Sequence, residues 1–395
     1  MRPEEDRRGG AIEEGPIQLF VPTFRVDECL REIRECLEKG WTGLGFKTVT
    51  FEAAWKAYSG LPHAHFVASA TAGLHLALQI LKDHGGWLEG DEVITTPLTF
   101  VSTNHAILHS GLRPVFADVD DHLCLDPETI ECRLSPRTRA VMFVGLGGNT
   151  GQLPRIAAWC RSRGLRLVLD AAHMAGTRLD GKHVGGEADA AVFSFQAVKN
   201  LPTADSGMLC FREQPLDEAA RKWSWLGINK DTYSRTNSSG QYRWRYDVEY
   251  VGFKYHSNSI MAALALVGLK YLDRDNEYRR ALANTYDQGL SESCSARPVA
   301  IAPGCESSRH LYQVLVDDRD ALMTSLNARN IYPGVHYADN TTFRMYASAD
   351  GSCPRARWAS DHLISLPLHL GLTDREISRV VRAVVDFVNC RKPHA

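Results

Sequence analysis

The chain has 395 residues, of which 44% are hydrophobic and 23% are charged, and its formal net charge at pH 7 is −2. This composition is typical of a globular protein and excludes a collagen-like or wholly disordered chain. The balanced charge gives no basic surface of the kind that binds nucleic acid, and no apolar run reaches the roughly 18 residues of a membrane-spanning helix. The first residues lack the apolar segment of a secretory signal, so we expect a cytoplasmic protein with no nucleic-acid or membrane partner. Its ten cysteines include no C-x-x-C pair, which argues against a metal or dithiol site and favours reduced, buried thiols.

The first half of the sequence alternates between short apolar runs and helical patterns. Residues 1–18 are charged and glycine-rich, which predicts a flexible tail, and residues 26–39 place apolar side chains at helical spacing before a glycine. Seven apolar runs follow, with helical patterns between several of them: residues 64–68, 91–95, 113–119, 140–144, 165–170, 190–195 and 208–211. Strands buried on both faces and joined by helices predict an α/β fold. We expect a large domain over residues 19–269, with a mostly parallel mixed sheet flanked by helices.

The pattern changes after Cys210. Residues 213–256 are rich in Trp, Tyr and Arg without a clear period, and such a long irregular segment is either functional or docked on a partner. A helix is expected over residues 258–272, and a strand over 310–317. Thr373 and Glu376 have the spacing of a capping box, which predicts the start of a final helix. These features predict a smaller C-terminal α+β domain over residues 270–395.

Four groups of residues follow predicted strands: Ser69–Gly73, Thr96–Phe100, Asp170–His173 and Ser194–Asn200. Ligand sites in open α/β sheets lie at the carboxyl ends of the strands, so these groups are expected to share one edge. Singly, each has a structural explanation: a helix N-cap, a core phenylalanine, an aspartate and histidine that stabilise a loop, and an exposed lysine. Together they supply an anion site at a helix N-terminus, an aromatic face, a carboxylate and a lysine amine. Pyridoxal phosphate (PLP) needs these groups for its phosphate, its ring, its protonated ring nitrogen and its aldehyde.

Six motifs in order resemble those of the DegT/StrS-type sugar aminotransferases, which are PLP enzymes of the aspartate-aminotransferase fold. The motifs are GDEVITTPLTFVSTNHAILHSGLRPVFADVD (90–120), LRLVLDAAHMAGT (165–177), FSFQAVKN (193–200), GFKYHSNSIMAA (252–263), NIYPGVHY (330–337) and SLPLHLGLTDREI (365–377). The resemblance runs from about Pro22 to Asn389, nearly the whole chain. The joint occurrence of these motifs in one order is highly specific.

The resemblance implies a role for individual residues. Lys199 would form the imine with PLP, Asp170 would pair with the ring nitrogen and His173 would lie against the ring, so these three are the expected catalytic residues. The other expected cofactor-binding residues are Ser69, Ala70, Thr71, Phe100, Ser194 and Lys254. Phe100 would stack on the second face of the ring, and most of the others would bind the phosphate. Trp41, Thr42 and His336 would face the substrate.

The resemblance also implies a homodimer with shared active sites. Lys254 stands where the family usually has an asparagine that reaches the phosphate in the neighbouring subunit, and residues 222–250 would fold over the partner's site. Lys254, His256, Arg245 and Arg344 are candidates for binding a diphosphate, although the arginines of 221–245 could equally be ordinary solvated charges.

The chain departs from the family pattern at three places. Residues 202–207 replace a Thr-Gly-Glu-Gly-Gly type run, Ser259 replaces an acidic residue, and residues 338–342 lack a frequent histidine. These changes are expected to affect substrate selection more than the core chemistry. Lys199 argues against the dehydratase branch of the family, in which a histidine replaces it.

By resemblance, the expected activity is transfer of an amino group from L-glutamate to a keto sugar linked to a nucleotide diphosphate, with a 4-keto-6-deoxy sugar favoured. Two alternatives stay open: a PLP-dependent sugar dehydratase or deaminase of the same fold, and a non-catalytic PLP-fold sensor or scaffold. A nicotinamide dehydrogenase is disfavoured because no G-x-G-x-x-G follows the first predicted strand.

Overall fold

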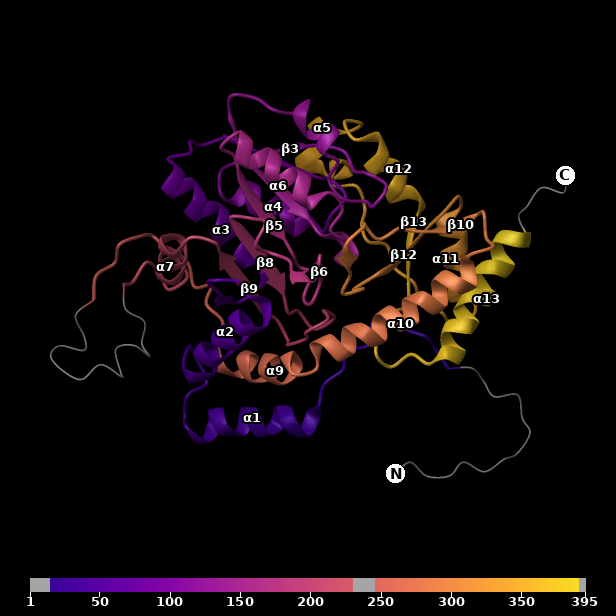
Figure 1. Cartoon of the computed structure of the whole chain (residues 1–395), viewed down its shortest axis with the longest axis horizontal. Coiled ribbons are helices and arrows are strands. Elements are labelled where there is room, and N and C mark those ends of the chain that lie inside the picture. Colours follow the sequence, from indigo (N-terminus) through magenta and orange to yellow (C-terminus); the bar gives the residue numbers. More distant parts are fainter. Residues whose placement is uncertain (1–14, 230–245, 391–395) are drawn as a thin grey trace.

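The computed structural model describes residues 15–229 and 246–390, which form a large unit and a smaller C-terminal unit (Figure 1). A seven-stranded sheet lies at the centre of the large unit. In spatial order its strands are β1 (His65–Val67), β9 (Gly207–Phe211), β8 (Ala190–Ser194), β5 (Arg166–Asp170), β4 (Thr138–Val144), β2 (Glu92–Thr95) and β3 (Arg113–Phe116). Strand β9 is antiparallel to both of its neighbours, whereas the pairs from β8 to β3 are all parallel. The mostly parallel mixed sheet expected from the sequence is therefore confirmed.

Helices cover both faces of this sheet because alternate residues of each strand point to opposite sides. In β4, Val141 and Phe143 join a core with α2 (Phe46–Ser59), α6 (Leu153–Ser162) and α9 (Ser259–Leu269). Ala140 and Met142, which point to the opposite face of the sheet, join a second core with α3 (Ala70–Gly85), α4 (Val101–His109) and α7 (Gln214–Trp223). Burial on both faces explains why the strands read as continuous apolar runs.

Several shorter or outer elements complete the large unit. Helix α1 (Val26–Glu38) packs on the outside of α9 (Figure 1). The short elements are α5 (Pro127–Glu131) and the 3-10 helix η1 (Leu146–Gly148). A small sheet of β11 (Cys305–Glu306), β6 (Arg178–Leu179) and β7 (Lys182–His183) joins strands from both units.

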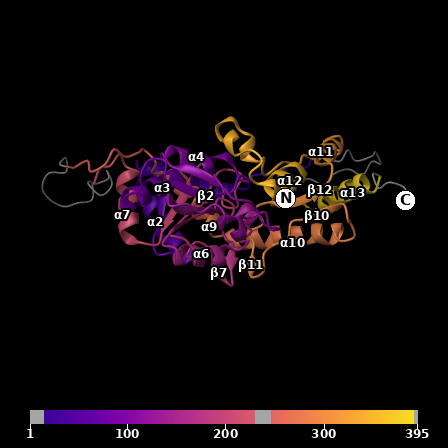
Figure 2. The same cartoon turned by 90° about the horizontal axis from the view of Figure 1, so that it is seen from above.

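The C-terminal unit is built on an antiparallel sheet of β10 (Ala296–Pro298), β12 (Tyr312–Val316) and β13 (Leu363–Leu366). Helix α10 (Leu272–Leu290) leads into it from the large unit, and Figure 2 shows the two units side by side. Its other elements are α11 (Arg319–Asn327), η2 (Asn340–Thr342), η3 (Arg344–Ala349), α12 (Pro354–His362) and α13 (Asp374–Cys390). The capping box at the start of α13 forms as expected, since Thr373 N donates to Glu376 Oε2 (2.8 Å) and Glu376 N donates to Thr373 Oγ1 (3.3 Å).

The structure corrects the prediction of a flexible tail for residues 15–18. Residues 1–14 lie outside the described residues, but Ile17 is only 1% exposed and packs in the core of the C-terminal unit. Its N–H donates to Asn330 O (2.8 Å), and its carbonyl accepts from Tyr332 N (2.9 Å). Residues 15–18 are therefore held by an apolar contact and a short parallel bridge, which composition alone did not reveal.

The structure also bears on the expectations about membrane-spanning helices and about cysteines. None of the helices within 15–229 and 246–390 is long and apolar enough to cross a membrane. All ten cysteines are free thiols, and most of them are buried.

Candidate active site

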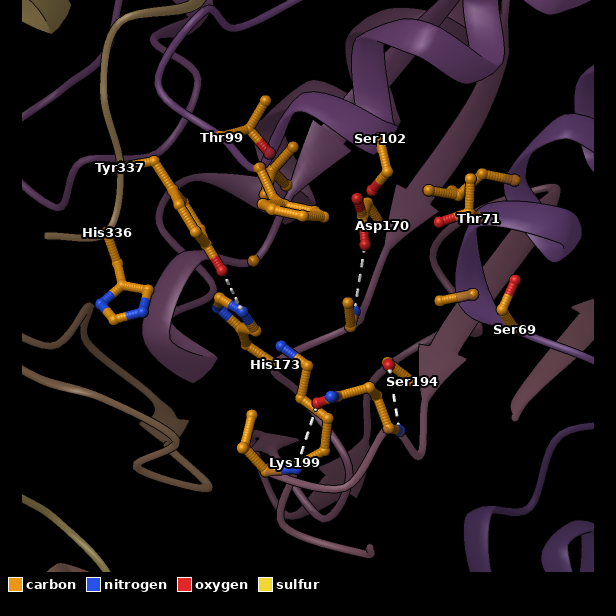
Figure 3. Close-up of a pocket in the computed structure, with 18 of the residues that line it drawn as sticks. Ser69, Thr71, Thr99, Ser102, Asp170, His173, Ser194, Lys199, His336 and Tyr337 are labelled. Carbon is orange, nitrogen blue, oxygen red and sulfur yellow. Dashed lines mark hydrogen bonds between the residues drawn. The ribbon is translucent and has the colours of Figure 1, made fainter. Parts of the chain in front are cut away.

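A cavity of about 420 Å³ opens at the carboxyl ends of β4, β5 and β8, beside the first turn of α3. The C-terminal unit closes it on one side with His336 and Tyr337 (Figure 3). Nine residues expected from the sequence line it: Ser69, Ala70, Thr71, Phe100, Asp170, His173, Ser194, Lys199 and His336. A volume of this size is typical of a pocket for a small-molecule ligand.

The first turn of α3 forms one wall of the cavity. Ser69 caps the helix, because its hydroxyl oxygen accepts a hydrogen bond from Ala72 N (3.1 Å). The N–H groups of Ala70 and Thr71 have no acceptor in an α-helix, and they make no hydrogen bond within the described part of the chain. Free amides at the positive end of a helix dipole, with the hydroxyl of Ser194 nearby, suit an anion such as phosphate.

Gly207 lets β9 pack closely against this turn. A Cβ at this position would lie 2.8 Å from Ala70 N and 2.8 Å from Phe193 O, and both of these are backbone atoms. Because backbone cannot move aside as a side-chain end can, only glycine fits here. The glycine that remains in the divergent run 202–207 therefore shapes the anion-binding turn.

Asp170 ends β5 with its carboxylate at the cavity wall (Figure 3). Its Oδ2 accepts a hydrogen bond from the Thr103 hydroxyl (2.7 Å), and its Oδ1 accepts one from Ala172 N (3.1 Å). Burial raises the pKa of Asp170, although both hydrogen bonds and the charge of Lys199 act in the opposite direction. Among the described residues, Asp170 has no salt-bridge partner within ion-pair distance, so a cation in the cavity would stabilise its charged form.

Lys199 lies in the turn that follows β8, with its amine at the cavity (Figure 3). Its Nζ lies 3.4 Å from Nε2 of His310. Removal from water lowers the pKa of Lys199 to about 8, although the charge of Asp170 acts to raise it. A lysine in this state has a neutral fraction near neutral pH, as a nucleophile or base requires.

His173 is held in one tautomer by its neighbours. Its Nδ1 accepts a hydrogen bond from Gly147 N (3.1 Å), so Nε2 carries the proton and donates to the Tyr337 hydroxyl (3.1 Å). Burial lowers the pKa of His173 well below its ordinary value, and the charge of Lys199 lowers it further. The ring is therefore neutral and offers a flat surface to the cavity.

Aromatic rings from the two units meet at the cavity mouth. Phe100 precedes α4, is 55% exposed, and lies 5.7 Å from the ring of Tyr337 between centroids. His336 is fixed by a contact of 3.0 Å between its Nδ1 and Ser365 Oγ, and burial lowers the pKa of His336 to about 4. These rings form an apolar rim around the polar floor.

Three residues expected at the site do not line this cavity. Trp41 and Thr42 lie between α1 and α2, where the Trp41 indole donates to Leu44 O (2.7 Å) and Thr42 O accepts from Ser259 N (3.1 Å). Lys254 lies over the ring of Trp225, with Nζ 3.2 Å from the centroid. Burial lowers the pKa of Lys254.

None of the diphosphate candidates among the described residues lines this cavity. His256 and Arg344 do not line the cavity, and Arg245 lies outside the described residues, as do residues 230–245 of the irregular segment. Within the described ranges, no group of three or more His, Cys, Asp or Glu side chains is arranged to hold a metal ion.

Sequence reasoning missed several residues that shape the site. Thr103 and Tyr337 stand within motifs that the sequence singled out, and each contacts an expected catalytic residue. His310 belongs to the expected strand 310–317 and gave no signal of its own. Its contact with Lys199 spans 111 residues of sequence, which no local pattern could reveal.

The residues present fit PLP. The Ala70 and Thr71 amides with Ser194 would hold the phosphate, Asp170 would face the ring nitrogen, and Lys199 would bind the aldehyde carbon. The buried carboxylate without a cationic partner and the turn that excludes a Cβ at Gly207 support this fit from the geometry alone.

Comparisons with known proteins point to the same chemistry. The model of the DegT/DnrJ/EryC1/StrS aminotransferase family matches residues 25–385. The spore coat polysaccharide biosynthesis protein SpsC of Bacillus subtilis (strain 168) is 35% identical over 373 residues, which cover 91% of this chain and 94% of that protein. The crystal structure of the aminotransferase TlmJ from Streptoalloteichus hindustanus has a TM-score of 0.88 and 35% identity, and the match covers 96% of this chain and 100% of TlmJ. Spr1654 from Streptococcus pneumoniae in its PMP form has a TM-score of 0.86 and 27% identity, with 94% and 99% of the two chains covered.

Proposed function

The chain belongs to the DegT/DnrJ/EryC1/StrS aminotransferase family of sugar aminotransferases, and from that premise we propose the reaction it catalyses. The protein transfers an amino group from L-glutamate to the keto group of a sugar linked to a nucleotide diphosphate, favouring a 4-keto-6-deoxy sugar. PLP is the cofactor, and the product is an amino sugar. The observation that carries the proposal is that Lys199, whose pKa is lowered to about 8, and the buried carboxylate of Asp170 line the same cavity.

Bound PLP supplies an electron sink that stabilises negative charge at the reacting carbon of the amino donor. The charged carboxylate of Asp170 favours a proton on the ring nitrogen, and Thr103 and Ala172 orient that carboxylate. The neutral ring of His173 would lie against one face of the cofactor and Phe100 against the other.

Lys199 is the base of the reaction. Its neutral amine would take the proton from Cα of the amino donor, and the ammonium so formed would return that proton to the cofactor carbon C4′. A positioned base of this kind typically contributes about 10²–10⁴-fold to the rate, and it works best when its pKa is near the working pH. A pKa of about 8 for Lys199 meets that condition.

The active unit in this proposal is a homodimer with shared sites. Lys254 does not line the cavity of its own chain, and exposed apolar side chains shortly precede it in sequence, including Val248 and Val251. Lys254 of one subunit would bind the phosphate in the other subunit as a point charge. Trp41, Thr42 and His336 would contact the sugar, while His256 and Arg344 are candidates for its diphosphate.

The remaining parts of the proposal concern the whole chain. We place the domain boundary between residues 269 and 270, which falls between α9 and α10. We also propose that the protein works in the cytoplasm, where nucleotide sugars would be its substrates.

The test is a panel of nucleotide-linked keto sugars incubated with PLP and L-[¹⁵N]glutamate, with products weighed by mass spectrometry. A sugar that gains ¹⁵N and loses its keto oxygen supports the proposal. The Lys199→Ala variant is the control and should form no amino sugar. Loss of a sugar oxygen without gain of nitrogen would instead identify a dehydratase, and no change in sugar or glutamate would identify a non-catalytic protein.

A further inference from the structure

Lys199 lies between two cavities. Besides the active-site cavity, it lines a small cavity of about 10 Å³ whose other walls include Phe20, Arg279 and His310. His310 lines this second cavity and not the active-site cavity, so it contacts Lys199 from a side that PLP would not occupy. His310 is 3% exposed and belongs to the segment just before β12.

The tautomer of His310 is fixed by a chain of hydrogen bonds. Asn276 Nδ2 donates to Ala175 O (2.9 Å), so Asn276 Oδ1 is free to accept from Asn200 Nδ2 (2.7 Å). Asn200 Nδ2 also donates to Ser308 O (2.7 Å), which fixes the orientation of its amide. Asn200 Oδ1 therefore faces Nδ1 of His310 (3.0 Å), and because this oxygen can only accept, Nδ1 carries the proton.

With its proton on Nδ1, neutral His310 presents an unprotonated Nε2 to the amine of Lys199. Phe20 stacks on the imidazole with centroids 5.4 Å apart and planes 6° apart, and the ring of His173 lies 4.4 Å away. These contacts leave the ring little freedom to turn. The Nε2 lone pair therefore stays aimed at Lys199 Nζ, 3.4 Å away.

The charges around this pair keep His310 neutral. Burial lowers the pKa of His310 well below its ordinary value, and the positive charges of Lys199 and Arg279 lower it further. His173 and His336 also face the ring and would act in the same direction if they were protonated. Asp170 acts on Lys199 in the opposite direction, because its negative charge raises the pKa of the Lys199 amine. His310 is thus an acceptor over the range of pH in which Lys199 gains and loses its proton.

We propose that His310 is a positioning residue for Lys199, whose amine donates a hydrogen bond to His310 Nε2 whenever it is not bound to the cofactor. The bond holds the amine beside the reacting carbon and stabilises the ammonium that forms when Lys199 accepts a proton from the donor Cα. The proton returns from the same nitrogen, so His310 itself neither gains nor loses one. This inference rests on the role of Lys199 in the proposed function.

Removing the acceptor should make the Lys199 ammonium less stable. A hydrogen bond to a charged group shifts an equilibrium by roughly tenfold or more, so we expect the pKa of Lys199 in His310→Phe to fall by about one unit. The phenyl ring keeps the shape and the stacking with Phe20. His310→Gln restores an amide oxygen that can accept the bond, and it should return the pKa most of the way. Phe20→Leu disturbs the same packing without removing the acceptor and should leave the pKa unchanged.

The measurement uses the full-length apoenzyme, without any sugar. Competitive labelling with acetic anhydride across a pH series, followed by mass spectrometry of the Lys199 peptide, gives the pKa of this one amine, with Lys254 as the internal reference. The pH dependence of PLP uptake by the apoenzyme should move to lower pH by the same amount, because the neutral amine is the reactive form. Circular dichroism checks that each variant folds, and His310→Leu replaces His310→Phe if that variant does not.

An unchanged Lys199 pKa in His310→Phe would overturn the inference. So would a His310→Gln variant whose pKa falls as far as that of His310→Phe, since the effect would then be structural. The labelling result does not depend on the sugar assay. A shifted pKa in a protein that aminates no sugar would leave this inference standing while the proposed reaction fails.

Discussion

Thr103→Val tests whether the environment of Asp170 controls the active site. Thr103 is fully buried in α4, and its hydroxyl donates the shorter of the two hydrogen bonds that Asp170 accepts, at 2.7 Å against 3.1 Å from Ala172 N. The Thr99 hydroxyl in turn lies 2.9 Å from Thr103 Oγ1 and supports it. Valine keeps the shape of threonine but cannot donate.

The size of the effect follows from the charge of the acceptor. A hydrogen bond to a charged group contributes about 1.5–3 kcal/mol, and one pKa unit corresponds to about 1.4 kcal/mol. The pKa of Asp170 is already raised by burial, so Thr103→Val should raise it by a further one to two units. Because the charged carboxylate is the active form, activity is lost as pH falls through this pKa, and the variant should lose activity at a correspondingly higher pH.

The assay is the pH profile of turnover with L-glutamate, measured together with the affinity for PLP. We expect turnover near the acid limb to fall roughly ten- to a hundredfold, with PLP still bound but more weakly. Thr95→Val is the matched control, because Thr95 is equally buried and its hydroxyl donates to Asn104 Oδ1 (3.1 Å) instead. An unshifted acid limb in Thr103→Val, or the same shift in Thr95→Val, would refute the reasoning.

Three further predictions concern the site and the stability of the fold. Gly207→Ala should weaken PLP binding and lower the free energy of unfolding by about 1–3 kcal/mol, because its Cβ would lie 2.8 Å from the backbone of Ala70 and of Phe193. An unchanged PLP titration together with an unchanged urea unfolding curve would contradict this prediction. Asp170→Asn should retain some PLP but lose most turnover, since the amide cannot supply the negative charge; a wild-type rate with glutamate would remove its role. Burial lowers the pKa of His183 to about 4 from an unfolded value of 6.5, so the unfolded chain binds the proton more tightly. The free energy of unfolding should therefore decrease as the pH is lowered, by about 2 kcal/mol from this group between pH 7 and pH 5. Urea unfolding at those two pH values should show a smaller decrease in His183→Gln than in the wild type.

Much of the large unit could be predicted from sequence because its strands are buried on both faces. Runs such as 140–144 and 165–170 are apolar throughout, and they became β4 and β5. The end of the predicted tail was harder to predict, because Ile17 is held by a parallel bridge to Ile331, more than 300 residues away in sequence. The composition of residues 1–18 does not predict a contact over this separation.

The sequence by itself determined the α/β fold and the groups at the strand ends that include Asp170 and Lys199, because side-chain period and strand-terminal position are local properties. Only the tertiary structure decided which side chains set their protonation and orientation. Thr103 reaches Asp170 across 67 residues of sequence, and His310 reaches Lys199 across 111. Desolvation and hydrogen bonding depend on what packing brings within a few ångströms, and that distance is unrelated to separation along the chain.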